Sequence, residues 1–216
     1  MKFETHHTQS ATEYESQRSQ NALINHRKEL IEQQFEKFEP KRILDLGCGT
    51  GGIVADMAGK FPNREFVGFD PENKFITFAQ SKFILPNLKF TNALNTNIGF
   101  DLIYSIDVLH HVDNWQDFVP WVQSLLSPQG KWLLIEPNSY NLYIYILQRR
   151  PGERPFATKQ FSQQATRVGM KLERSFYYHL WPSGIKSVSA FGKYIENIIE
   201  KVPVLAGSVV QIWKKV

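Results

Sequence analysis

A turn rich in glycine follows a short apolar run in the first quarter of the chain. The segment reads Ile43-Leu44-Asp45-Leu46-Gly47-Cys48-Gly49-Thr50-Gly51-Gly52. An apolar run of this length is typical of a buried strand, and the glycines permit a tight turn against which a ligand can lie. Apolar residues at helical spacing then predict a helix over residues 53–61. A strand, a glycine turn and a helix in this order are typical of a nucleotide-binding pocket.

The acid at position 45 bears on which nucleotide this turn would bind. Gly47, Gly49 and Gly52 have the spacing of a dinucleotide fingerprint, in which a pyrophosphate lies at the helix N-terminus. Asp45 is expected at the carboxyl end of the same strand, where its charge would repel a phosphate and attract an ammonium or a sulfonium. S-adenosylmethionine (SAM) carries both of these cations and no phosphate. The segment alone favours SAM and leaves NAD as the alternative.

The glycine turn and four later segments resemble class I SAM-dependent methyltransferases. Asp45 to Gly51 is similar to the first motif of that family, and the later segments follow in the family's order. They are Phe69-Asp70-Pro71, Thr91-Asn92-Ala93-Leu94, the stretch from Asp101 to Val112 with its Leu109-His110-His111, and Trp132 to Asn138. The resemblance covers about residues 41–137 well and continues more loosely to the end. It implies a Rossmann-like fold, SAM as the cofactor and S-adenosylhomocysteine as the product.

In an open α/β sheet the ligand lies at the carboxyl ends of the strands, so the cofactor residues are sought there. Asp70 can accept hydrogen bonds from the ribose hydroxyls, or it can cap the helix that Pro71 begins. The family often has an acid where this chain has Asn92, whose carbonyl oxygen can still accept from an adenine amino group. The predicted cofactor-binding residues are Asp45, Gly47, Cys48, Gly49, Gly51, Asp70, Pro71, Asn92, Ala93, Leu94 and Ser105.

Three titratable residues after the fourth expected strand are candidate catalytic residues. His110, His111 and Asp107 are expected where a base could reach the pocket, and histidine titrates near neutral pH. A base is needed only if the acceptor must lose a proton, because alignment of an activated donor with its acceptor supplies much of the rate. In the alternative interpretation, one histidine packs in the fold and the other bonds to the backbone. No metal site is predicted.

Strands and helices alternate over the middle of the chain. Strands are predicted at residues 42–46, 65–69, 88–90, 100–105 and 131–136, and helices at 53–61, 72–83 and 115–126. A turn at residues 127–130 is expected before the fifth strand, and one helix over residues 14–38 is expected to precede the first. This alternation predicts right-handed crossovers and a parallel sheet covered on both faces.

The last third of the chain differs from this pattern. It predicts a helix at residues 158–168, strands at 171–179 and 208–214, and an apolar helix face between residues 185 and 202. Two late strands joined by a long connection are expected to pair antiparallel at an edge of the sheet. The resemblance completes the fold class as α/β, a doubly wound sheet of seven strands with an antiparallel last strand. The predicted organisation is a helical cap over residues 1–40 and a SAM-binding domain over 41–216, with acceptor-site additions within 138–207.

Composition limits the setting in which the chain acts. Its 216 residues are 42% hydrophobic and contain one cysteine, which excludes an intramolecular disulfide and fits a reducing compartment. Cys48 is interpreted as a small residue suited to a tight turn, with a reactive thiol as the alternative. The polar N-terminal stretch lacks the apolar core of a signal peptide, and no stretch is long enough for a membrane span. A cytoplasmic protein is expected.

The acceptor is less well defined than the cofactor. The net charge of +4 arises in the last third, which suits an anionic partner, including an anionic membrane touched at its periphery. Residues 142–147 are an apolar run flanked by Tyr and Arg, either an amphiphile-contacting surface or a helix packed on the core. Glu136-Pro137-Asn138 and the C-terminal segments are loosely similar to bacterial methyltransferases of glycan and lipid-linked sugar pathways.

The leading functional hypothesis is therefore O-methylation of a small-molecule, sugar or lipid-linked acceptor by direct displacement. The alternatives are a SAM-binding regulator without turnover, an RNA methyltransferase and an NAD-dependent oxidoreductase. Nucleic acid is disfavoured, because no Asn-Pro-Pro-Tyr-type segment that would hold a flipped base follows the fourth strand. The sequence does not specify the oligomeric state.

Overall fold

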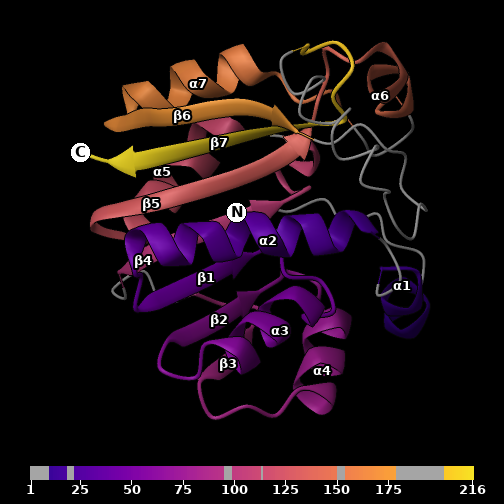
Figure 1. Ribbon diagram of the computed structural model, residues 1–216, viewed down its shortest axis with the longest axis vertical. Coiled ribbons are helices and arrows are strands. Elements are labelled where there is room, and N and C mark those ends of the chain that lie inside the picture. Colours follow the sequence, from indigo (N-terminus) through magenta and orange to yellow (C-terminus); the bar gives the residue numbers. More distant parts are fainter. Residues whose placement is uncertain (1–9, 19–21, 95–98, 113, 150–153, 179–201) are drawn as a thin grey trace.

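The chain forms a central sheet with helices on both faces (Figure 1). The computed structural model describes residues 10–18, 22–94, 99–112, 114–149, 154–178 and 202–216. The strands are β1 (Arg42–Leu46), β2 (Glu65–Phe69), β3 (Leu88–Thr91), β4 (Phe100–Ile106), β5 (Leu126–Pro137), β6 (Met170–Tyr178) and β7 (Ser208–Lys215). The helices are α1 (Ala11–Arg18), α2 (Ala22–Phe38), α3 (Gly52–Lys60), α4 (Asn73–Lys82), α5 (Trp115–Leu125), α6 (Leu142–Leu147) and α7 (Thr158–Arg167), with a 3-10 turn η1 (Leu109–His111).

The seven strands lie in the order β3-β2-β1-β4-β5-β7-β6. The pairs among β1 to β5 are parallel, whereas β7 runs antiparallel to both of its neighbours, β5 and β6. This confirms the predicted Rossmann-like sheet and its antiparallel last strand. The chain progresses in opposite directions across the sheet from β1 and from β4, so a crevice is expected where the carboxyl ends of these two strands meet.

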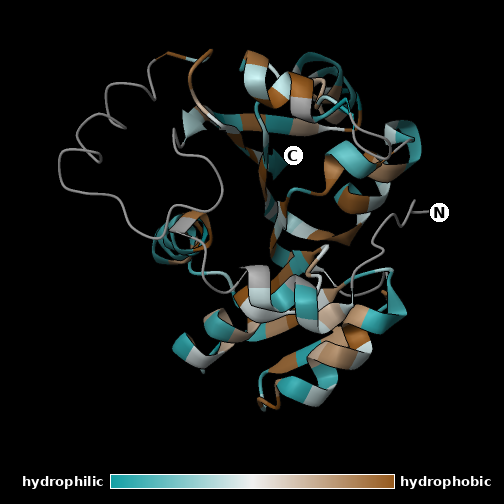
Figure 2. Ribbon diagram, turned by 90° about the vertical axis from the view of Figure 1, so that its right-hand side faces the viewer, coloured by the Kyte–Doolittle hydropathy of each residue, from teal (hydrophilic) through white to brown (hydrophobic). Residues whose placement is uncertain are grey.

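Two apolar clusters, one on each face, hold the layers together. One joins the sheet to α2, α3 and α4, and the other joins it to α5 and α7. Neighbouring strand residues alternate between the two clusters, as Ile43 and Leu44 do in β1. Strands buried on both faces are nearly all apolar. Figure 2 shows the sheet nearly edge-on, with helices on both sides of it. No helix among the described residues is both long and apolar enough to cross a membrane.

The N-terminal region differs from the single helix predicted over residues 14–38. The structure has two helices, α1 and α2, and α1 begins at Ala11, three residues before the predicted start. A capping box, Ser10-Ala11-Thr12-Glu13, explains why α1 begins at Ala11. The Ser10 hydroxyl accepts from the Glu13 backbone N–H at 3.3 Å, and the Ser10 backbone N–H donates to the Glu13 carboxylate at 3.0 Å. The motif is visible in the sequence as Ser10 followed three residues later by Glu13.

The turn predicted at residues 127–130 is wrong, because β5 already begins at Leu126 and runs through these residues. Leu126 pairs with Phe100, and the register then shifts before the regular pairing resumes. Gln129 has a φ of +67°, so the strand is irregular where a turn was expected. The late strands β6 and β7 confirm the predicted antiparallel pair, whereas the helix predicted within residues 185–202 lies almost wholly outside the described residues.

Candidate functional site

The glycine turn leads from β1 to α3 and needs glycine for two separate reasons. Gly47, Gly49 and Gly51 have φ values of +82°, +55° and +82°, a region that side chains with a Cβ rarely enter. A Cβ on Gly47 would also lie 2.4 Å from Cγ2 of Val108, in the loop after β4. The backbone N–H groups of Gly47 and Cys48 donate to the Phe69 carbonyl at 2.8 and 2.9 Å, which ties the turn to the end of β2.

Asp70 joins this turn to the segment before α4. One carboxylate oxygen accepts from the Gly49 backbone N–H and the other from the Glu72 backbone N–H, each at 2.9 Å. Asp70 is buried, and an ionised carboxylate has about four lone-pair sites with which it can accept hydrogen bonds. Pro71 follows it before α4 begins at Asn73. The predicted helix cap is wrong, because the N-cap of α4 is Glu72, no side chain caps the helix, and Pro71 is not its first residue. The contact of Asp70 with a ribose stays a prediction.

Asp45 places a carboxylate inside the sheet, just before the turn. It is buried, and its register partner on β4 is Tyr104, which is buried completely. Burial raises the pKa of the Tyr104 phenol well above its ordinary value, and the charge of Asp45 beside it raises that pKa further. The raised pKa keeps Tyr104 protonated and neutral, so the negative charge at this place in the sheet is that of Asp45 at the end of β1.

A third carboxylate reaches the turn from α1. The Thr50 hydroxyl donates to Glu15 at 2.5 Å, and the Lys82 ammonium lies 3.2 Å from the other Glu15 oxygen. A Cβ on Gly52, the first residue of α3, would lie 3.2 Å from Glu15, so this carboxylate occupies the space beside the helix N-terminus. A dinucleotide places its pyrophosphate there. The turn therefore fits a nucleotide that carries positive charge and no phosphate, as SAM does.

The predicted adenine-binding residues lie after β3. Asn92 is exposed, and its side-chain nitrogen donates to Asn73 at 3.3 Å. The Thr91 hydroxyl fixes the next turn through the N–H and carbonyl of Ala93, at 3.0 and 2.7 Å. Leu94 packs against the cluster on the α5 face. The structure brings these residues to the same edge of the sheet as Asp70, and their contacts with adenine stay predictions.

Two other predicted cofactor residues are buried by the protein itself. Ser105 on β4 is wholly buried, and its hydroxyl accepts from the Trp132 indole at 3.0 Å. Cys48 is buried on the other face of the sheet, and its Sγ would lie 3.1 Å from a Cβ on Gly68. This close packing favours the interpretation of Cys48 as a small turn residue. The cofactor contacts of Ser105 and Cys48 stay predictions.

The loop after β4 is held by a buried acid that is not among the predicted site residues. Glu136, at the end of β5, is fully buried and accepts from the backbone N–H groups of Val108 and Leu109 at 2.9 and 2.8 Å. Its second oxygen lies 2.9 Å from Nδ1 of His110 and 3.4 Å from the His110 backbone nitrogen. An ionised carboxylate only accepts hydrogen bonds, so beside an ionised Glu136 the ring proton lies on Nδ1 and Nε2 is the nitrogen able to accept another.

The other two candidate catalytic residues flank this pair. Asp107 has a φ of +55° and forms an ion pair of 2.5 Å with Arg27 of α2, whose side chain is buried. The His111 ring lies on the His110 ring with centroids 4.0 Å apart. The structure thus brings His110, His111 and Asp107 together after β4, and their catalytic roles stay predictions. Among the described residues, no cluster of three or more metal-ligating side chains is found.

Comparison with known proteins gives relatives of several kinds. The chain is 30% identical over 147 residues to trans-aconitate 2-methyltransferase of Methylobacterium radiotolerans, covering 65% of this chain and 56% of that protein. It is 29% identical over 125 residues to the secondary metabolism regulator laeA of Coprinopsis cinerea, covering 55% of this chain and 29% of that protein. The chain therefore spans about half of the first relative and less than a third of the second.

A SAM-dependent methyltransferase from Archaeoglobus fulgidus has a similar fold, with a TM-score of 0.59 at 20% identity over 87% of this chain and 94% of that one. The family model described as "Methyltransferase domain" matches residues 14–178, which is more than half of the chain. The match includes the glycine turn, Asp70 and the loop after β4, the features that carry the candidate site. The chain belongs to this methyltransferase domain family and has the Rossmann-like fold of class I SAM-dependent methyltransferases.

Proposed function

We propose that the protein is a SAM-dependent methyltransferase that methylates an oxygen atom of a small-molecule acceptor. The observation that carries this proposal is the glycine turn at the meeting point of β1 and β4, surrounded by carboxylates from Asp45, Asp70 and Glu15. When bound, SAM supplies an activated methyl group that an acceptor oxygen takes by displacement, forming a C–O bond as the C–S bond breaks and leaving S-adenosylhomocysteine.

Each part of the cofactor is assigned to different residues in and around the glycine turn. The glycine backbone allows close approach, Asp45 attracts the cationic end, and Asp70 offers acceptors for the ribose hydroxyls. Glu15 disfavours a phosphate beside α3. Asn92, Ala93 and Leu94 are placed for the adenine. This division supports SAM over NAD on electrostatic grounds.

A small-molecule acceptor is supported by the names of the trans-aconitate methyltransferases among the relatives. An acid offers an oxygen that is already deprotonated, so its methylation needs no base. His110 then positions the loop after β4, whereas for a hydroxyl acceptor its Nε2 would remove the proton. Separate His110→Ala and His111→Ala variants test this choice. Loss of a required base lowers turnover roughly 100-fold or more, and loss of a positioning residue lowers it less.

Calorimetry and product analysis test the proposed function directly. The wild-type protein should bind SAM and S-adenosylhomocysteine but not NAD, and Asp45→Asn should weaken SAM binding. Incubation with SAM that carries a deuterated methyl group should transfer that label to a small acid, detected by mass spectrometry. Absence of SAM and S-adenosylhomocysteine binding at millimolar concentration would contradict the proposal, as would NAD binding that survives Asp45→Asn.

A SAM-binding regulator without turnover is the second candidate, favoured by the relative named as a regulator of secondary metabolism. Cofactor binding with no labelled product from any acceptor would support it. RNA binding with a steep salt dependence would instead favour RNA methylation.

A cytoplasmic location with peripheral membrane contact is part of the proposal. Leu142, Tyr143 and Ile146 on α6 are 70%, 63% and 60% exposed, which supports the amphiphile-contacting interpretation of this run over a helix packed on the core. Sedimentation with phosphatidylserine vesicles, compared with neutral vesicles, tests it. Leu142→Ser should reduce anionic-vesicle binding, and equal sedimentation with both vesicles would contradict a role for charge.

A further inference from the structure

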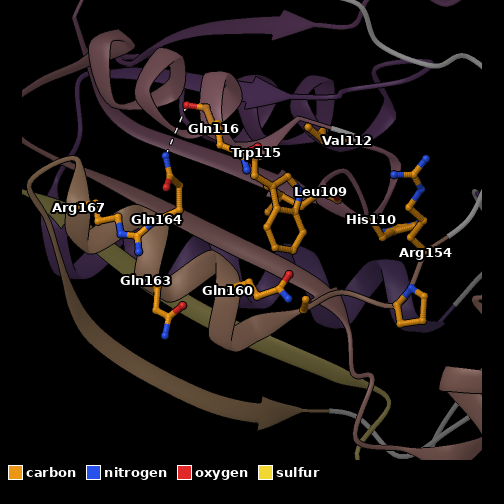
Figure 3. A pocket seen from close by; sticks show the side chains of 12 residues that line it. Leu109, His110, Val112, Trp115, Gln116, Arg154, Gln160, Gln163, Gln164 and Arg167 are labelled. Atoms are coloured by element: carbon orange, nitrogen blue, oxygen red, sulfur yellow. Dashed lines mark hydrogen bonds between the residues drawn. The ribbon is translucent and has the colours of Figure 1, made fainter.

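A groove of about 490 Å³ lies between α5 and α7, beside the loop after β4 (Figure 3). Its wall on the α7 side is polar. Gln160, Gln163, Gln164 and Arg167 line it, and their spacing places them on one face of the helix. Phe161 and Ala165 of the same helix are buried in the apolar cluster. The helix therefore turns its polar stripe toward the groove while its short apolar stripe packs on the sheet.

The groove is elongated and carries positive charge at both ends. Figure 3 shows Arg154 near His110 at one end and Arg167 at the other. Gln160 and Arg167 are seven residues apart, which corresponds to about 10 Å along the helix. None of the described side chains that line the groove is an acid. Between the arginines, the glutamine amides supply donors and acceptors for a bound polar molecule.

The opposite wall is rigid. The Trp115 indole donates to the Leu109 carbonyl at 3.2 Å and packs against Phe156 and Phe161, with ring centroids 5.6 and 6.0 Å apart. Gln116 follows on α5, and its carbonyl accepts from the Gln164 side chain at 3.5 Å across the groove. A wall fixed by packing and hydrogen bonds reduces the ordering cost of binding.

His110 connects this groove to the candidate cofactor site. It lines the groove and is fixed by Glu136 at the carboxyl ends of β4 and β5. A molecule that enters the groove at this end would place one group near the strand ends where the cofactor is expected. The remainder of that molecule would lie along α7 toward Arg167.

We propose that this groove binds the methyl acceptor, and that the acceptor is an elongated small acid with at least two carboxylates. One carboxylate lies at the His110 end beside Arg154, and another pairs with Arg167, while the glutamine amides bind polar groups between them. A guanidinium binds a carboxylate through two parallel hydrogen bonds, which selects acids over neutral sugars. That the bound acid is the methyl acceptor rests on the function proposed above. That the groove binds such an acid rests on the groove's own residues.

Tricarballylate, a flexible tricarboxylate, is a suitable probe for the isolated protein. Titration into ¹⁵N-labelled protein should shift the Trp115 indole signal and the side-chain amides of Gln160, Gln163 and Gln164. Arg167→Gln should weaken this binding about tenfold or more, as expected for a lost charge-assisted hydrogen bond. Arg167→Lys should retain part of the affinity because it keeps the charge.

Lys159→Gln is the matched control. Lys159 is an exposed residue of the same helix that does not line the groove, and its substitution removes the same charge. It should change tricarballylate affinity less than about twofold, since distant exposed charges are largely screened. Equal losses in Lys159→Gln and Arg167→Gln would show general charge attraction and overturn the proposal. Equal affinity of wild type and Arg167→Gln, absence of saturable binding, or butyrate binding as tightly as tricarballylate would do the same.

Parallel calorimetry with S-adenosylhomocysteine separates this inference from the proposed function. All four proteins should bind S-adenosylhomocysteine equally, because these substitutions lie outside the glycine turn. Failure of S-adenosylhomocysteine binding with intact, Arg167-dependent tricarballylate binding would contradict the methyltransferase proposal and leave the acid-binding groove supported. Normal S-adenosylhomocysteine binding without tricarballylate binding would overturn the groove alone.

Discussion

Glu136 is the residue on which the geometry of the loop after β4 depends most. Each of its two oxygens faces two N–H donors, from the backbone of residues 108–110 and from the His110 ring. A buried carboxylate is tolerated when its acceptor sites are filled in this way. The same bonds hold Val108 beside Gly47 and fix His110, so one acid positions a neighbour of the glycine turn and a residue of the groove between α5 and α7.

Glu136→Gln should lower the free energy of unfolding by about 2–4 kcal/mol. In either orientation of the amide, its NH₂ group would face two N–H donors, which leaves buried donors without acceptors. Urea denaturation checks this through the midpoint at unchanged m-value. Glu173→Gln removes the same charge from a less buried pair with Lys131 and should cost less than about 1 kcal/mol. Equal losses of unfolding free energy in the two variants would show that the buried bonds of Glu136 stabilise the fold no more than the partly exposed pair of Glu173 does.

Two constraints can require a glycine: a positive φ and a lack of space for a Cβ. Three glycines of this chain carry both constraints, one of them, or neither. Gly47 has a φ of +82° and no room for a Cβ, Gly169 has a φ of +79° with no atom within 4 Å of a Cβ, and Gly59 of α3 has neither constraint. Gly169→Ala should destabilise by about 1–2 kcal/mol, and Gly59→Ala should stabilise by about 0.5–1 kcal/mol. Gly47→Ala should cost about 1–3 kcal/mol more than Gly169→Ala.

Thermal and urea unfolding check this series, and calorimetry with S-adenosylhomocysteine should show lost affinity in Gly47→Ala alone. A Gly47→Ala protein as stable as Gly169→Ala would mean that Val108 moves aside without cost.

Several residues of the candidate site were predictable from local sequence, and others were not. The glycine turn and Asp70 carry their signal in neighbouring residues and in the spacing to the next strand. Glu15, Arg27 and Glu136 contact partners that lie 26 to 80 residues away in the sequence. Glu15 and Thr50, for example, are 35 residues apart. Their roles follow from strand order, which no local pattern specifies.

Among the elements, three strands meet at Asp101 on the edge opposite the candidate site. Its carboxylate accepts from the Lys41 and Arg42 backbone N–H groups, each at 3.0 Å, and from the Ser127 hydroxyl at 2.9 Å. Burial raises the pKa of Asp101, but the two backbone donors, the Ser127 hydroxyl and the charge of Arg42 together bring it below its ordinary value.

This lowered pKa predicts a contribution to stability that depends on pH. A carboxyl whose pKa is lower in the folded state stabilises the fold above its unfolded pKa, about 3.9, and loses this effect as the pH falls through the folded value. Asp101→Asn should therefore be less stable than wild type at pH 7 by about 0.5–1.5 kcal/mol. The difference should shrink below about pH 4.

Urea denaturation at a series of pH values measures this difference. Glu65→Gln, which removes a charge from an exposed partner of Arg42, should show a smaller and nearly constant difference. A gap between wild type and Asp101→Asn that widens in acid would contradict the assignment.

Element bounds were predictable where periodicity and capping act locally. The ranges of β1 and β2 agree with the prediction, because both are short apolar runs ended by turns. The start of β5 was misplaced, because Ser127 and Pro128 carry a turn signal, whereas the pairing of Leu126 with Phe100 extends the strand. Tertiary pairing overrode local turn propensity there.

At the scale of the whole molecule, each of the two apolar clusters contains a different probe of unfolding, and the clusters lie on opposite faces of one sheet. The four described tryptophans, Trp115, Trp121, Trp132 and Trp213, belong to or pack against the cluster on the α5 and α7 face. Cys48, the single cysteine, is buried in the other cluster. Successive residues of each inner strand belong to alternate clusters. Unfolding of the cluster on one face therefore disrupts the strands that also form the cluster on the other face.

Unfolding of the two faces should therefore coincide. Tryptophan fluorescence and thiol labelling of Cys48 should give the same urea midpoint, as in a cooperative transition. A Trp181→Phe background removes the tryptophan that lies outside the described residues. Midpoints that differ between the probes would show that the faces unfold separately. The sheet order itself was predictable only through the family resemblance, because periodicity gives strands without their neighbours.

Glu15 has a consequence for how the turn selects its nucleotide. Its carboxylate is a tethered anion held beside α3 by Thr50 and Lys82. A tethered carboxylate competes for the space beside the helix N-terminus at an effective concentration on the order of millimolar. A nucleotide that carries a phosphate must displace the Glu15 carboxylate before it can bind at the glycine turn. A nucleotide without phosphate meets no such competition. We therefore expect an N-terminal helix that lies outside the glycine motif to contribute to the discrimination between nucleotides.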